Sequence, residues 1–120
     1  EYAHARICSL LRAMESEGVQ VPGLKETDST LLNGETEEAL IKQLAVFCEE
    51  IRLAARDYDP SHINRYLMEL AGCFHRFYTA CRIKGEEASV AAARLKLADC
   101  TRIVLKNGLR LIGVDAPEKM

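Results

Sequence analysis

The sequence contains no tryptophan, only three prolines and no long uninterrupted apolar run. The shortage of proline argues against a proline-rich linker and a turn-rich β-sandwich. A membrane-spanning helix needs roughly 18 consecutive apolar residues, and no stretch approaches that length. Phosphate-binding motifs of the G-x-x-x-x-G-K-[ST] and G-x-G-x-x-G types are also absent. We therefore expect no membrane partner and no nucleotide site of these types.

Acidic and basic side chains are unevenly divided between the two halves of the chain. The 120 residues carry a net charge of −2 and suit a single domain over residues 1–120. The first 59 residues hold 12 acidic and 6 basic side chains, whereas residues 60–120 hold 6 acidic and 10 basic ones. A polyanionic partner is therefore expected to contact the second half.

Five scattered cysteines form no C-x-x-C pair: Cys8, Cys48, Cys73, Cys81 and Cys100. Their odd number and dispersion predict reduced thiols in a reducing compartment, in agreement with a cytoplasmic location. A metal site built from Cys73, His75 and Cys81 has no usual zinc spacing, so we favour core packing for these residues and expect no metal.

Apolar residues repeat at helical spacing in four segments, and no segment has the alternation of a strand. The predicted helices span about residues 2–16, 36–58, 60–83 and 87–112, with a long loop over about 18–35. In the third segment the stripe is Ile63, Leu67, Leu70, Phe74, Phe77 and Cys81. The sequence predicts an all-α fold, a bundle of four main amphipathic helices.

The predicted helix ends rest on local signals. Gly18 is expected to stop the first helix, and Thr36 to cap the second, whose apolar stripe runs from Leu40 to Tyr58. Asp59 and Pro60 predict the start of the third helix. Gly108 interrupts the helical propensity of the fourth, for which we favour a close contact with another helix.

A second stripe lies beside the core stripe of the third helix: Ala71, His75, Tyr78 and Arg82. Aromatic rings beside a cation suit single-stranded nucleic acid, because bases stack on rings and Arg binds phosphate. The alternative is that His75 and Tyr78 are boundary residues hydrogen-bonded inside the bundle. Spacing alone leaves both interpretations open.

A basic ridge is predicted on the fourth helix, where Arg102, Lys106 and Arg110 recur every four residues and Arg94 lies two steps earlier. Either a solvated helix face or a contact with an RNA backbone would explain it. The acidic runs Glu37–Glu38 and Glu49–Glu50 are interpreted as solvated faces. No catalytic arrangement stands out, since Ser61 and His62 are merely neighbours at a helix start.

Several short motifs occur in a characteristic order along the chain. They are Tyr2–Ile7 (YAHARI), Pro60–Ala71 (P-x-x-I-x-x-Y-L-x-x-L-A), Phe74–Tyr78 (FHRFY), Ala93–Leu95 (ARL), Asn107–Leu109 (NGL) and the closing Ala116–Met120 (APEKM). With these motifs in this order, the chain resembles the C-terminal, all-helical anticodon-binding domain of arginyl-tRNA synthetases, often called the DALR domain. The likeness covers essentially the whole chain.

The resemblance implies a domain that binds the anticodon stem and loop of the tRNA for arginine, within a monomeric class I synthetase. The catalytic domain in cis would use ATP and Mg²⁺, whereas this segment would hold no cofactor and no catalytic residue. Because the chain starts at Glu1 and lacks a D-A-L-R tetrad, we expect it to be a fragment cut at its N-terminus. In the family, a Tyr of the F-H-x-F-Y helix and the terminal Met contact anticodon bases, which assigns these roles to Tyr78 and Met120.

The tRNA-binding residues predicted from spacing alone are His75, Arg82, Arg102 and Lys106. Two departures from the family pattern stand out: Cys48 replaces a frequent Pro, which predicts a less bent second helix, and Lys119 replaces the usual Arg. Alternatives are a related helical domain of a glycyl-tRNA synthetase β subunit, or a helical protein-docking module that binds no RNA.

Overall fold

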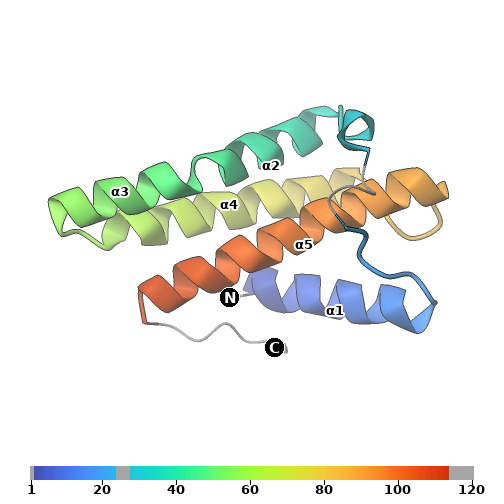
Figure 1. The fold of residues 1–120 in the computed structure, drawn as a ribbon, viewed down its shortest axis with the longest axis horizontal. Helices are drawn as coiled ribbons and strands as arrows, with labels where there is room; N and C mark the ends of the chain where they lie inside the picture. Colours follow the sequence, from blue (N-terminus) through green and yellow to red (C-terminus); the bar gives the residue numbers. More distant parts are fainter. Residues whose placement is uncertain (1, 24–27, 114–120) are drawn as a thin grey trace.

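The computed structural model describes residues 2–23 and 28–113 (Figure 1). Over these residues the chain forms helices and no strand. The elements are α1 (Tyr2–Ser16), the short 3-10 helix η2 (Ser29–Leu31), α2 (Glu35–Ala45), α3 (Phe47–Asp57), α4 (Ser61–Ala80) and α5 (Ala88–Leu111). The predicted all-α bundle of four main helices is confirmed, with α2 and α3 together taking the place of the second. None of the described helices combines the length and apolar character needed to cross a membrane.

Helix α4 occupies the centre of the bundle (Figure 1). Helices α2 and α3 follow one another along one side of α4 and run in the opposite direction, while α5 packs between α4 and α1. The C-terminal ends of α1 and α4 and the N-terminal ends of α2 and α5 therefore meet at one end of the bundle, at the right in Figure 1.

The apolar stripes predicted from the sequence form the core. All six residues of the stripe from Ile63 on α4 to Cys81 just after it are buried, and Phe74 and Phe77 are completely inaccessible to solvent. The long loop contributes as well, because Leu32 is buried and Leu31 packs against the same cluster. Tyr58 is an exception: it was predicted at the end of a buried stripe but is 93% exposed. It adopts a left-handed conformation (φ 52°) that ends α3 and turns its side chain away from the core.

The second helix is not continuous, in contrast to the prediction. It is interrupted at Val46 (φ −92°, ψ 5°), although no proline is present there. At this point the Tyr66 hydroxyl of α4 donates to the carbonyl of Gln43 at 2.5 Å, which is the acceptor that a continuous helix would use for the N–H of Phe47. The Tyr66 ring packs against Phe47 at the start of α3, with 5.6 Å between ring centroids. Burial raises the pKa of Tyr66, so the phenol remains a hydrogen-bond donor at neutral pH.

The helix starts partly agree with the predicted caps. Asp59 accepts a bond from the backbone N–H of Ser61 at 3.0 Å, but the N-cap is Pro60 and α4 begins at Ser61, one residue later than predicted. Thr36, however, is not the cap of α2: Gly34 holds that position, and the Glu37 carboxylate accepts its N–H at 3.0 Å. Gly18 ends the first helical segment with φ 82°, as predicted.

Gly108 marks the close contact between α5 and α4 that the sequence predicted. A Cβ built on Gly108 would lie 2.5 Å from Cδ2 of Leu67, and Leu67 is itself buried. We expect Gly108→Ala to lower the free energy of unfolding by about 1–2 kcal/mol, because overpacking outweighs the better helix propensity of alanine. Urea denaturation of the variant measures this change.

Gly72 provides the matched control for Gly108→Ala. Its added Cβ would meet only the guanidinium end of Arg76, at 3.4 Å, which can move aside. Gly72→Ala should therefore leave stability unchanged or raise it by up to about 1 kcal/mol. Equal stabilisation by both substitutions would show that the contact at Gly108 is not tight.

Candidate nucleic-acid interface

A groove runs between α1 and the C-terminal end of α4. Its apolar floor comes from Leu10, Met14 and Ile83, and its polar walls carry Arg6, Ser9, Tyr78, Thr79, Arg82 and Lys84. Three cations thus line one groove, and one of them, Lys84, also contacts Glu17 at 3.1 Å. The predicted residues Tyr78 and Arg82 are brought together here, as their spacing on the third helix implied.

Arg6 lies at the centre of an aromatic cluster beside this groove. Its guanidinium carbon is 4.4 Å from the centroid of the Tyr78 ring and 5.9 Å from that of Tyr2. Its Nη1 also donates to Nδ1 of His75, at 3.5 Å. The Tyr78 ring stacks on Phe74 as well, with 5.8 Å between centroids. An aromatic ring and a cation therefore form one continuous surface.

His75 contributes a neutral side chain to this cluster. Partial burial lowers its pKa from the usual 6.5, and the positive charge of Arg6 lowers it further. At neutral pH the imidazole is therefore uncharged and can accept the bond from Arg6. Its ring also lies 5.5 Å from that of Tyr2. His75 thus holds Arg6 in place and adds no positive charge to the groove.

Arg94 does not belong to the basic ridge, in contrast to the sequence interpretation. It forms an ion pair with Glu37, with 3.3 Å between Nε and Oε2, and the two side chains are only 19% and 3% exposed. Glu37 is consequently buried and not part of a solvated face, whereas its neighbour Glu38 is exposed. The spacing within each helix could not predict this pair, because Glu37 and Arg94 lie on different helices, 57 positions apart.

The remaining ridge residues lie outside the groove. Arg102 pairs with Asp99 on its own helix at 2.9 Å, and both are partly buried. Lys106 is half-buried and Arg110 is exposed. Neither Arg102 nor Lys106 lines the groove between α1 and α4, so their contact with RNA stays a prediction. Met120 lies outside the described residues.

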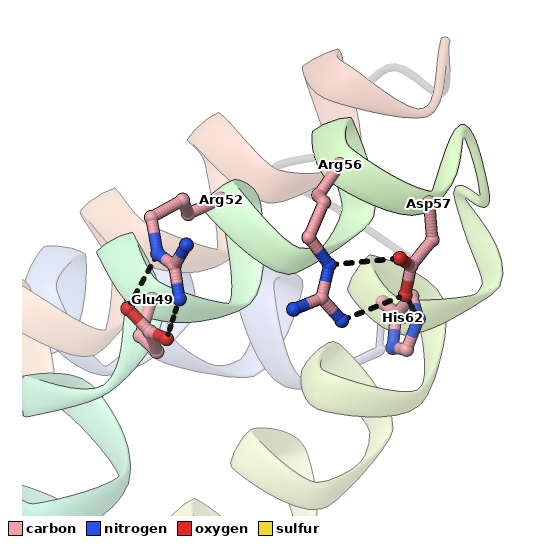
Figure 2. A network of polar contacts seen from close by, with 5 residues as sticks. All are labelled: Glu49, Arg52, Arg56, Asp57 and His62. Carbon is pink, nitrogen blue, oxygen red and sulfur yellow. Dashed lines mark hydrogen bonds and ion pairs between the residues drawn. The ribbon is translucent and has the colours of Figure 1, made fainter.

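The charged outer face of α3 has a different character (Figure 2). Arg52 binds Glu49 with two hydrogen bonds, of 2.6 and 3.0 Å, and this contact lowers the pKa of the Glu49 carboxyl. Asp57 binds Arg56 at 2.9 Å and the His62 ring at 3.1 Å. Exposed pairs of this kind contribute little stability. Because its cations have carboxylate partners, this face offers less positive charge than the groove.

Sequence reasoning missed Arg6 and Tyr2 as site residues. The available signal was their spacing, since residues four apart on a helix share one face. What the spacing could not show is their common partner on α4, because this partner, His75, is 69 positions from Arg6 along the chain. His62 contacts Asp57 and not the neighbouring Ser61, and no group of three metal-ligating side chains occurs among the described residues.

These features define an all-α module with an aromatic and cationic groove, a combination that suits single-stranded nucleic acid. The chain belongs to the DALR anticodon binding domain family, which matches residues 1–120. It is 47% identical over its whole length to arginine–tRNA ligase of Ruminiclostridium cellulolyticum and 48% identical to that of Acetivibrio thermocellus, and covers 21% of each. The resemblance to arginyl-tRNA synthetases is thereby confirmed.

The fold agrees with a solved structure. Thermus thermophilus arginyl-tRNA synthetase matches 99% of this chain with a TM-score of 0.84 and 28% sequence identity, over 20% of its own length. The chain therefore spans about a fifth of the length of these relatives. At that identity and TM-score, the match supports both the fold and the family assignment.

Proposed function

We propose that this chain binds the anticodon stem and loop of the tRNA for arginine, as the anticodon-binding domain of an arginine–tRNA ligase. Family membership and the arginine–tRNA ligase relatives support this function. The observation that carries the proposal is the contact between Arg6 and Tyr78 at the edge of a groove that also holds Arg82 and Lys84. Aromatic and cationic groups are placed together where a single-stranded loop needs both.

The groove would hold RNA by stacking and by charge neutralisation. An unstacked base would meet the edge of the Tyr78 ring together with the Arg6 guanidinium, which can itself stack on bases. The exposed Arg82 and Lys84 would neutralise backbone phosphates next to that base. His75, neutral and bound to Arg6, would keep the guanidinium over the ring.

The complete ligase supplies the chemistry in this proposal. Its catalytic domain in cis would join arginine to tRNA in the cytoplasm with ATP and Mg²⁺, as a monomer, while the present chain would only position the tRNA. Arg102 and Lys106 would form a secondary backbone contact on α5. Met120 would meet an anticodon base from the C-terminal tail, and its soft, flexible side chain suits such a contact.

Competition between tRNA transcripts tests the proposed function. The full-length protein should bind a labelled arginine tRNA transcript, and an unlabelled glycine tRNA transcript should compete poorly. The affinity for tRNA should fall steeply as the salt concentration rises, because the Lys and Arg side chains that bind the RNA backbone release its counterions. Fluorescence anisotropy measures both effects. Equal competition would favour the glycyl alternative, and negligible, salt-insensitive binding would favour a protein-docking module.

A further inference from the structure

The segment that follows α4 forms one wall of the groove without being helical. Helix α4 ends at Ala80, and Cys81 adopts an extended conformation (φ −120°, ψ 108°). Residues 82–84 then line the groove through Arg82, Ile83 and Lys84. A wall made of non-helical backbone lacks the regular hydrogen bonds that hold a helix, so its position depends on other contacts.

One such contact comes from α5. Nη1 of Arg94 donates to the backbone carbonyl of Arg82 at 2.6 Å. On the same guanidinium, Nε pairs with the Glu37 carboxylate at 3.3 Å. The bond to Arg82 is made to the main chain and leaves the Arg82 side chain free to remain exposed in the groove.

Glu37 is itself fixed at the start of α2. Its Oε1 accepts the N–H of Gly34 at 3.0 Å while its Oε2 binds Arg94. A single polar chain thus connects the start of α2, the first turns of α5 and the end of α4. The planar guanidinium offers several donors in a fixed arrangement, so it can serve a carboxylate and a carbonyl together, whereas a lysine ammonium is a compact point charge.

We propose that Arg94, held by Glu37, is a positioning residue for tRNA binding: it fixes the Arg82 carbonyl and thereby the cationic wall at residues 82–84. This inference rests on the proposed RNA-binding function of the groove. Arg94 itself does not line the groove. Its substitution should therefore weaken RNA binding only through the segment that it holds, which sets it apart from a residue that contacts RNA directly.

A double-mutant cycle in the full-length protein tests this role, with a labelled arginine tRNA transcript as the probe. We expect Arg94→Lys and Arg82→Ala each to weaken tRNA binding about fivefold. The double variant should bind no more than about twofold more weakly than Arg82→Ala alone, because the effects of two residues that act through one another are not additive. Additive losses, or unchanged binding by Arg94→Lys, would overturn the proposal.

Two further variants separate positioning from general destabilisation. Gly108→Ala should lower stability without changing tRNA affinity, because it touches Leu67 and not the groove. The positioning role is wrong if Gly108→Ala and Arg94→Lys lose tRNA affinity in the same proportion to their loss of stability. Glu37→Gln keeps an acceptor for the N–H of Gly34 but loses the negative charge that holds Arg94. Its effect on tRNA affinity should be non-additive with that of Arg82→Ala, as for Arg94→Lys. If Arg94→Lys does not fold, Glu37→Gln replaces it in the double-mutant cycle.

Tyr78→Ala distinguishes failure of this inference from failure of the proposed function. A loss of affinity in Tyr78→Ala without coupling between Arg94 and Arg82 would remove only the positioning role. Unchanged binding by both Tyr78→Ala and Arg82→Ala would remove the RNA-binding groove, and the positioning role with it.

Discussion

Replacing Glu37 with alanine should lower the free energy of unfolding of the chain by about 3 kcal/mol, because removing one partner of a buried ion pair leaves the other charge uncompensated. The Arg94 side chain is 19% exposed, so water can partly solvate its uncompensated charge, which keeps the loss at the lower end of the usual range. The same substitution removes the acceptor for the N–H of Gly34 at the start of α2, adding to the cost.

Urea denaturation measures this change, and the neighbouring carboxylate gives the control. Glu38 lies in the same helical turn but is exposed, so Glu38→Ala should alter stability by no more than about 0.5 kcal/mol. The loss of stability in Glu37→Gln should fall between those of Glu37→Ala and Glu38→Ala, since glutamine can still accept the N–H of Gly34. If Glu37→Ala and Glu38→Ala have the same effect, the buried pair does not stabilise the bundle.

Replacing Tyr78 with alanine should weaken binding of the arginine tRNA about 5- to 150-fold, the range given by about 1–3 kcal/mol for one stacked base, because the base would stack on the pair formed by Tyr78 and the Arg6 guanidinium. The substitution also removes the ring under the Arg6 guanidinium. Arg6 would then lose the surface that orients it, and part of its contribution to RNA binding would be lost as well. Fluorescence anisotropy with the full-length protein provides the measurement.

Two tyrosine variants control this experiment. Tyr78→Phe keeps the ring and should retain most of the affinity, which identifies stacking and not the hydroxyl as the cause. Tyr58→Ala removes an exposed ring at the end of α3, outside the groove, and should bind tRNA like the unmodified protein. The stacking role of Tyr78 would be contradicted by an equal loss in Tyr78→Phe and Tyr78→Ala.

The helices were predictable because their apolar spacing is local information. The stripe from Ile63 to Cys81 was recovered completely, since a 4-3-4 repeat determines which face of a helix is buried. The interruption at Val46 was not predictable, because the Tyr66 hydroxyl that takes the Gln43 carbonyl there belongs to another helix. Cys48 in place of proline suggested a straighter helix, yet the helix is interrupted at this tertiary contact.

The site was predictable in part for the same reason. Tyr78 and Arg82 lie on one side of the third helical segment, and the structure places both in the groove. Arg6 completes the site from α1, and Arg94 leaves the predicted ridge to pair with Glu37. Both outcomes depend on contacts between residues more than 50 positions apart, which periodicity within one helix cannot show.

Footprinting of the arginine tRNA by the full-length protein, with and without Tyr78→Ala, tests whether Tyr78 binds the anticodon loop. We expect the unmodified protein to protect nucleotides of the anticodon loop and the variant to lose most or all of this protection, while protection elsewhere on the tRNA persists. Protection of the anticodon loop that is identical with and without Tyr78, or no protection of that loop at all, would show that Tyr78 does not bind it.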